Sequence, residues 1–223
     1  MLTTTPAFLI HERLQLEKHT WLTFFTPCKG LISTLRYRSK QRSYPPFQPF
    51  SLELVVKDSS VKVKRIEIDG FLPPLTYPCN WAGMYINELI YKALAEGETH
   101  TTLYTLYSHT IKTLSATPND MLATIRQFEH ALQINLGYAL SYECLDAHPH
   151  HMWFSFDPQE GLKPSHHTLT YAFSRSALLL LQQQAWQHPV TQDTSKRIFQ
   201  RVLKNILGEN ALFIKNTLPA SLK

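Results

Sequence analysis

Basic side chains alternate with polar or aromatic ones near residue 40, and this spacing could bind phosphate groups. In an extended chain, successive side chains point to opposite faces, so every second residue shares a face. Cations on one face would form a ladder for phosphates, and Tyr37 and Tyr44 could stack on bases. The four alternating cations are Arg36, Arg38, Lys40 and Arg42.

A second basic group follows at Lys62, Lys64 and Arg65. Both groups have a simpler explanation, because charged side chains also protect an edge strand or a loop from aggregation. The spacing favours nucleic-acid binding over that explanation. We therefore predict that all seven cations bind DNA.

Charge is distributed unevenly along the 223 residues, whose net charge is +5. Residues 1–76 carry 11 Lys and Arg against 6 Asp and Glu. Residues 70–160 are acidic, with 3 basic and 9 acidic side chains, and residues 161–223 are basic again, with 8 against 2. Two basic ends suit a polyanionic partner such as nucleic acid.

Arg126 is an isolated cation in the acidic middle of the chain, next to a helical apolar stripe. A guanidinium in that setting could bind a carboxylate of a partner protein. Taken alone, the position is more typical of an ordinary surface arginine whose stem packs on apolar neighbours.

Cysteine and histidine residues between positions 144 and 167 could bind zinc, but their spacings match no standard ligand pair. The residues concerned are Cys144, His148, His150, His151, His166 and His167. A polar surface loop is the favoured interpretation, and we predict no metal and no cofactor. The chain also lacks a glycine-rich phosphate loop, a GxSxG elbow and an HExxH pair, so we predict no catalytic residues and no enzymatic activity.

Two other functions remain open. A metal-dependent nuclease could use residues 148–151 and Asp157, and it would degrade DNA only with a divalent metal. A module for RNA or ribosomes would prefer RNA over single-stranded DNA in competition.

The elements that must position these residues change character near residue 76. Before it, five short segments rich in β-branched and aromatic residues, separated by turn residues, predict a five-stranded barrel of the OB-fold or SH3-like type. These segments are 7–13, 20–26, 31–37, 50–57 and 61–69. After it, helical periodicity dominates, except for an irregular region at 141–170. The prediction is an α+β fold with domains 1–76 and 77–223.

No signal peptide and no apolar run of membrane-spanning length is visible. The three cysteines are widely spaced, which argues against a disulfide framework. We therefore expect a soluble, cytoplasmic protein with no membrane partner.

Several short motifs resemble those of the bacterial RecO family, and they occur in order over nearly the whole chain. Residues 7–13 resemble the opening strand, residues 47–50 (FQPF) resemble Leu-Gln-Pro-Phe, and residues 83–89 (GMYINEL) resemble Gly-Leu-Tyr-x-Asn-Glu-Leu. Residues 126–138 contain RQFE and LGY, which are similar to Arg-Arg-Phe-Glu and Leu-Gly-Tyr. Residues 196–208 resemble the C-terminal helix.

The resemblance implies a DNA repair and recombination mediator of the RecF pathway. Such a protein has an N-terminal OB-fold and a helical part for partner docking. It binds single- and double-stranded DNA, anneals complementary strands, and acts with RecR to load RecA onto DNA coated by single-strand binding protein (SSB). The resemblance also implies that the acidic C-terminal tail of SSB binds Arg126, and that the protein joins the nucleoid during repair.

Two positions depart from the family pattern. The Lys-Gly-Ala-Arg segment of the family is replaced by residues 37–40 (YRSK), which keep the charge but lose the glycine. Cys144 matches the first ligand of a four-cysteine zinc site that some members carry, and the other three are missing. We therefore expect a degenerate, zinc-free version of this region at 141–170.

Overall fold

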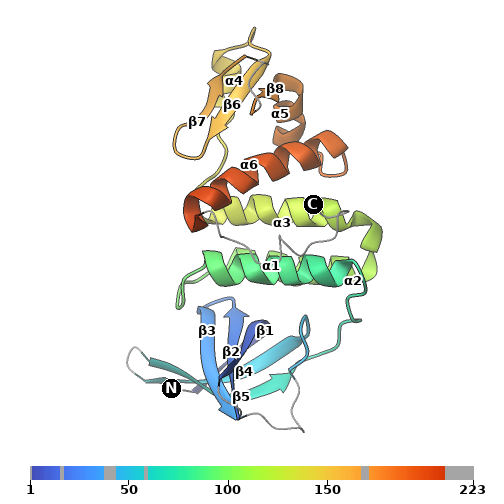
Figure 1. Ribbon diagram of the computed structural model, residues 1–223. Coiled ribbons are helices and arrows are strands. Elements are labelled where there is room, and N and C mark those ends of the chain that lie inside the picture. The colour runs from blue at the N-terminus through green and yellow to red at the C-terminus, as the bar shows by residue number, and fades with distance from the viewer. Residues whose placement is uncertain (1, 16–17, 38–43, 58–59, 167–170, 209–223) are drawn as a thin grey trace. The chain divides into compact units, whose positions relative to one another are not determined.

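The computed structural model describes residues 2–15, 18–37, 44–57, 60–166 and 171–208. The chain divides into two compact units, Met1–Pro118 and Asn119–Ala211. The first contains a curled five-stranded antiparallel sheet and two helices, and the second contains the remaining helices and a small three-stranded sheet (Figure 1). The predicted α+β class and N-terminal five-stranded sheet are confirmed.

The five predicted strands all form, in the spatial order β3-β2-β1-β4-β5. Their bounds are β1 Leu2–Gln15, β2 His19–Thr26, β3 Gly30–Tyr37, β4 Pro49–Lys57 and β5 Ser60–Ile68. The two edge strands, β3 and β5, approach each other. The Arg36 guanidinium on β3 donates a hydrogen bond to the carbonyl oxygen of Val63 on β5. This cyclic order is that of a partly open OB-fold barrel.

Residues Ala7 to Ile10 of β1 are all buried, although they lie in a strand where neighbouring side chains point to opposite faces. Both faces of this part of β1 are covered. Ala7 and Leu9 belong to the barrel interior, together with Phe24 and Phe50. Phe8 instead packs against rings of the following helices, which explains the unbroken apolar run in the sequence.

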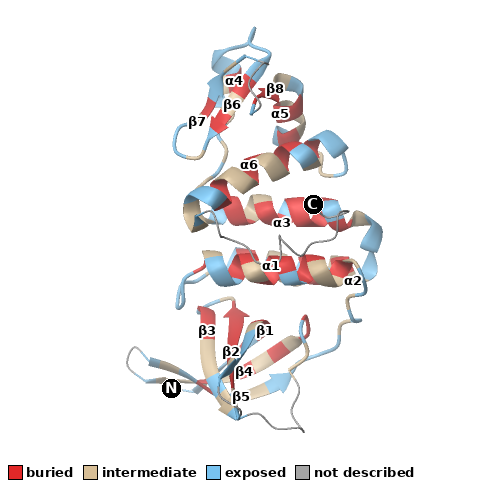
Figure 2. Ribbon diagram, in the orientation of Figure 1, coloured by how far each residue is buried: buried red, intermediate tan, exposed pale blue. Residues whose placement is uncertain are grey.

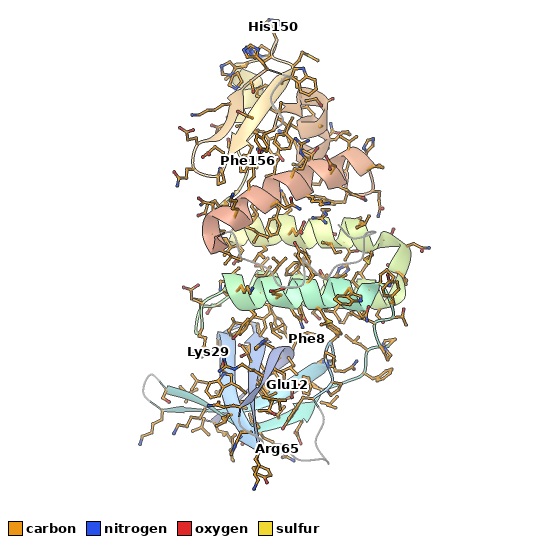
Figure 3. The ribbon with its side chains drawn as sticks, in the orientation of Figure 1. Phe8, Glu12, Lys29, Arg65, His150 and Phe156 are labelled. Atoms are coloured by element: carbon orange, nitrogen blue, oxygen red, sulfur yellow. The ribbon has the colours of Figure 1, made fainter. Side chains whose placement is uncertain are left out.

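Two helices, α1 (Cys79–Ala93) and α2 (Thr101–Ala116), pack against one end of the barrel. Phe8 lies where the sheet meets them (Figure 3), with its ring 5.1 Å from that of Tyr107. The buried Tyr107 hydroxyl donates a hydrogen bond of 2.7 Å to the Asn87 side chain on α1. Burial raises the pKa of Tyr107, so its hydroxyl stays a neutral donor.

Two segments that resemble family motifs pack directly on each other. The Gly83 backbone lies so close to Phe47 that an added Cβ would come within 2.7 Å of the Phe47 ring. Gln48 forms two hydrogen bonds with the backbone of Leu72, of 2.8 and 2.9 Å. These contacts therefore connect the start of β4 to helix α1, through Phe47 and Gly83, and to the segment after β5, through Gln48 and Leu72.

In the second unit, α6 (Pro189–Leu207) packs against both α3 (Met121–Asn135) and α5 (Arg175–Gln182). Residues 141–166 contain the short helix α4 (Glu143–Ala147) and a hairpin of β6 (Trp153–Asp157) and β7 (Gly161–Pro164), and β8 (Phe173–Ser174) pairs with β6. A core that includes Phe154, Phe156 and Phe173 holds these pieces together.

Within the part of the chain that the structure describes, no helix combines the length and apolar character needed to cross a membrane. The domain boundary predicted after residue 76 stays a prediction. The compact units themselves place α1 and α2 with the barrel.

Candidate nucleic-acid interface

The outer surface of β1, β2 and β3 carries two neighbouring rows of side chains that α1 and α2 do not bury. Strand pairing sets the rows, because directly opposed residues of antiparallel strands share a face. We call these rows the open face. It consists of Arg13, Trp21 and Leu35 in one row and Gln15, His19 and Tyr37 in the next.

The open face is accessible to a ligand. Tyr37 is 63% exposed and Leu35 is 42% exposed, which are high values for apolar side chains in a sheet. The His19 and Tyr37 rings meet edge to face, with centroids 5.6 Å apart. Trp21 and His19 are half-buried.

Helix coverage decides where the open face begins. At the other end of the same outer surface, Phe8 and Phe25 are opposed and buried beneath the tyrosines of α2. Figure 2 shows β3 changing from buried to exposed along its length, in agreement with its burial pattern. A single sheet surface thus serves as core at one end and as solvent-accessible surface at the other.

Trp21 and His19 were not among the predicted site residues. Both lie in the aromatic segment TWLTFFT or next to it, and their period-two spacing was visible. Their positions, with Trp21 opposite Leu35 and His19 opposite Tyr37, depend on strand register, which the sequence does not reveal. Tyr44, which could also stack on bases, is partly buried against the barrel core beside Phe50.

Arg36 lies in a row with Thr20, which is buried, so it is on the opposite side of β3 from Tyr37. Its bond to Val63 links β3 to β5 and commits at least part of the guanidinium to the barrel. Arg38, Lys40 and Arg42 lie outside the described residues.

The second basic group lies on β5. Lys64 forms an ion pair of 2.9 Å with Glu53, and Arg65 forms one of 2.8 Å with Glu67. Lys62 is exposed on the same strand, and Arg65 extends from the end of the barrel remote from α1 and α2 (Figure 3). Exposed ion pairs are worth at most about 1 kcal/mol, so phosphates could replace these carboxylates at little cost.

His11 adjoins the open face and gives the first unit a pH dependence. Its ring stacks on Tyr91 of α1 with centroids 4.1 Å apart, and its Nδ1 atom is buried with no hydrogen-bond partner among the described residues. Burial, and secondly the charge of Arg13, lower the pKa of His11 from its ordinary value of 6.5. The folded state therefore binds this proton less readily than the unfolded state.

We expect the protein to lose stability as the pH falls below about 6.5, because the unfolded state then gains a proton that folded His11 resists. The variant His11→Gln should lose less stability than the wild type between about pH 7.5 and pH 5.5. Urea unfolding midpoints at the two pH values measure this. An equal loss in the two proteins would show that His11 does not contribute.

Arg126 does not lie on an accessible surface. The Arg126 side chain is 8% exposed, and its guanidinium bonds to the Glu129 carboxylate one turn further along α3, which is 1% exposed. Without the family resemblance, the sequence predicted an ordinary surface arginine at this position. The helical spacing of the two residues could have suggested the pair.

The described cysteine and histidine side chains between positions 144 and 166 are not grouped as a metal centre. The Cys144 sulfur lies 3.8 Å from the His148 ring, but in the described parts of the chain no three Cys, His, Asp or Glu side chains are grouped to hold an ion. His150 lies in the connection between α4 and β6 (Figure 3), and His167 is not among the described residues. The Arg175 guanidinium bonds instead to the backbone oxygens of Leu145 and His148.

Comparison with known proteins identifies relatives along nearly the whole chain. The family model described as "Recombination protein O C terminal" matches residues 77–200. The DNA repair protein RecO of Proteus mirabilis is 28% identical over 216 residues, which cover 92% of this chain and 88% of the relative. That of Stutzerimonas stutzeri is 29% identical over 215 residues, covering 93% and 89%, and that of Pseudomonas aeruginosa is 28% identical over 212 residues, covering 92% and 90%.

Proposed function

Because the chain belongs to the RecO family of DNA repair and recombination proteins, we propose that it acts as a recombination mediator that binds DNA through its barrel and anneals complementary strands. The proposal covers single- and double-stranded DNA. It includes action with RecR to load RecA onto SSB-coated DNA in the RecF pathway. The protein would work without catalytic residues or a cofactor, in the cytoplasm and at the nucleoid during repair.

The observation that carries this proposal is the open face on strands β1, β2 and β3. OB-folds bind oligonucleotides on the face of strands 2 and 3, where this barrel carries the half-buried Trp21 and the exposed Leu35 and Tyr37. Arg13 lies in the same rows, and the cations at 38, 40 and 42 follow Tyr37 directly in the chain. Positive charge beside exposed rings matches a ligand made of phosphates and bases.

We assign the phosphate contacts to the alternating cations and to the basic group of β5, which includes Lys62. The Arg36 guanidinium also holds β3 to β5, which limits its contribution to phosphate binding. Such contacts do not depend on base sequence, and binding through them weakens as the salt concentration rises.

We expect the triple variant Arg38→Gln, Lys40→Gln, Arg42→Gln to bind DNA weakly and with a reduced salt dependence. Each phosphate contact with a single strand contributes about 0.7 to the slope of log K against log salt, so three lost contacts should reduce the slope by about 2. Fluorescence anisotropy of a labelled oligonucleotide at several salt concentrations measures this.

The matched control is the triple variant Lys29→Gln, Lys92→Gln, Lys112→Gln, which removes three positive charges from the same unit. It should keep the wild-type slope, because these residues lie outside the two basic groups. If both triple variants changed the slope equally, net charge alone would explain the binding.

Strand annealing on SSB-coated DNA tests the whole proposal. The wild type should accelerate pairing of complementary strands, and the Arg38, Lys40 and Arg42 triple variant should not. A wild-type protein that bound no oligonucleotide at low salt, or that left the strands unpaired, would exclude the proposed function. Metal-dependent loss of full-length DNA in the same assay would indicate a nuclease instead.

The second unit would bind the acidic tail of SSB through Arg126. A guanidinium can hold a carboxylate by two parallel hydrogen bonds. Here the incoming carboxylate must share or displace Glu129, because the two side chains are already bonded and buried. The contact would therefore require a local opening of α3 or its neighbours.

A further inference from the structure

We propose that the open face is a stacking platform for unpaired bases, which makes the barrel bind single-stranded DNA more tightly than duplex DNA. This inference rests on the proposed DNA binding and specifies which form of DNA this site takes. The rings that carry it are Trp21, His19 and Tyr37.

The arrangement of the three rings suits bases that lie along the strands. Trp21 and His19 are two residues apart on β2 and therefore share the outer face. Tyr37 is directly opposite His19 and lies diagonally from Trp21, at a distance of about 7–8 Å between backbone positions. Leu35, opposite Trp21, fills the fourth position with an apolar side chain.

The apolar exposure of this face is not explained by the fold. Tyr37 and Leu35 keep 63% and 42% of their surface exposed, whereas Phe8 and Phe25 on the same outer surface are almost fully buried. An exposed group of aromatic and aliphatic side chains usually marks a binding surface. The β1 side chains within the two rows are cationic or neutral, since these are Arg13 and Gln15.

Charge favours nucleic acid over protein as the occupant. Arg13 lies directly opposite Trp21, and the exposed Lys18 precedes His19 in the turn between β1 and β2. A strand that stacks its bases on the rings would bring its phosphates to these cations. Every base has an apolar face, so the stacking would be tolerant of sequence.

Selectivity for single strands follows from the geometry of stacking. The base faces of a duplex are covered by neighbouring base pairs, so an aromatic ring can reach them only after unstacking. Phosphates are exposed in both forms. Rings should therefore add affinity for single strands alone, whereas cations add affinity for both. Bases held by their faces also keep their edges for pairing, which suits an annealing protein.

The test compares single-stranded and duplex binding for platform variants. We expect Tyr37→Leu to weaken binding of an oligothymidylate by about fivefold, and Trp21→Leu with Tyr37→Leu to weaken it by about tenfold to a hundredfold. Duplex affinity and the salt slope should stay at wild-type values. The control Phe71→Leu removes a 77% exposed aromatic side chain of the same unit outside the sheet and should change neither affinity.

A conservative variant keeps the test valid if Trp21→Leu fails to fold. Oligothymidylate should quench the tryptophan fluorescence of the wild type, and most of that quenching should disappear in Trp21→Phe, which keeps an aromatic ring. Quenching that persists in Trp21→Phe would overturn the platform.

The outcomes separate this inference from the proposed function. Equal loss of single-stranded and duplex binding, or no loss of either, in the Tyr37 variant would overturn the platform while DNA binding still stood. Unchanged DNA affinities would assign the open face to a protein partner instead. A wild-type protein that binds neither form of DNA would exclude the proposed function itself.

Discussion

Replacing Gly30 by alanine should destabilise the barrel unit by at least about 3 kcal/mol. Gly30 has a φ angle of +53°, a conformation that costs an L-residue about 1–2 kcal/mol. In addition, a Cβ at this position would overlap with the backbone carbonyl oxygen of Glu98, which cannot rotate away as a side chain would. Urea unfolding followed by circular dichroism measures the effect.

The reason for this crowding is the segment between α1 and α2, which lies against the β2–β3 turn. Gly97 donates a hydrogen bond to the Leu31 carbonyl, His100 donates one to the Pro27 carbonyl, and the Thr99 hydroxyl donates one to the Cys28 carbonyl. An alanine at position 30 would force the two segments apart. These bonds would then be lost together with the close contact.

Gly97→Ala provides the matched control. Gly97 also has a positive φ, of +83°, but an added Cβ there meets no atom within 4 Å. Gly97→Ala should lower the stability only by the cost of a positive φ for an L-residue, which is about 1–2 kcal/mol. If Gly30→Ala were no more destabilising than Gly97→Ala, the close approach of Glu98 would not limit the fold.

Replacing Arg126 by alanine should destabilise the second unit by about 3–5 kcal/mol, because it removes one partner of a buried ion pair. The Glu129 carboxylate would remain 1% exposed in the native structure without its arginine. Urea or thermal unfolding measures the loss. Lys163→Ala breaks an exposed pair with Glu160 at the same sequence spacing and should cost less than about 1 kcal/mol.

The double variant Arg126→Met with Glu129→Gln removes both charges and should recover most of the stability. It also tests the proposed SSB contact without the complication of unfolding. A folded double variant that bound the SSB tail peptide as well as the wild type would exclude Arg126 as its receptor. A stable Arg126→Ala protein would show that the pair is not needed in the core.

Local periodicity made much of the fold predictable. The alternation of residues 50–57 and the aromatic, β-branched segment around Trp21 predicted strands, and all five predicted strands form. Helical periodicity after residue 76 predicted helices, and α1 forms there with Ile86 and Leu89 fully buried. These patterns repeat over a few residues, so they can be read without knowing the rest of the chain.

The sequence by itself determined the α+β class, the five strands, the helical second half and the cations that could hold phosphates. Tertiary structure alone decided that Trp21 and His19 lie opposite Leu35 and Tyr37, that Arg36 bonds across the barrel, and that Arg126 is buried with Glu129. Register and burial depend on contacts between residues far apart in the chain. A one-residue change of register would have turned every ring of the open face into the barrel, and no local pattern excludes it.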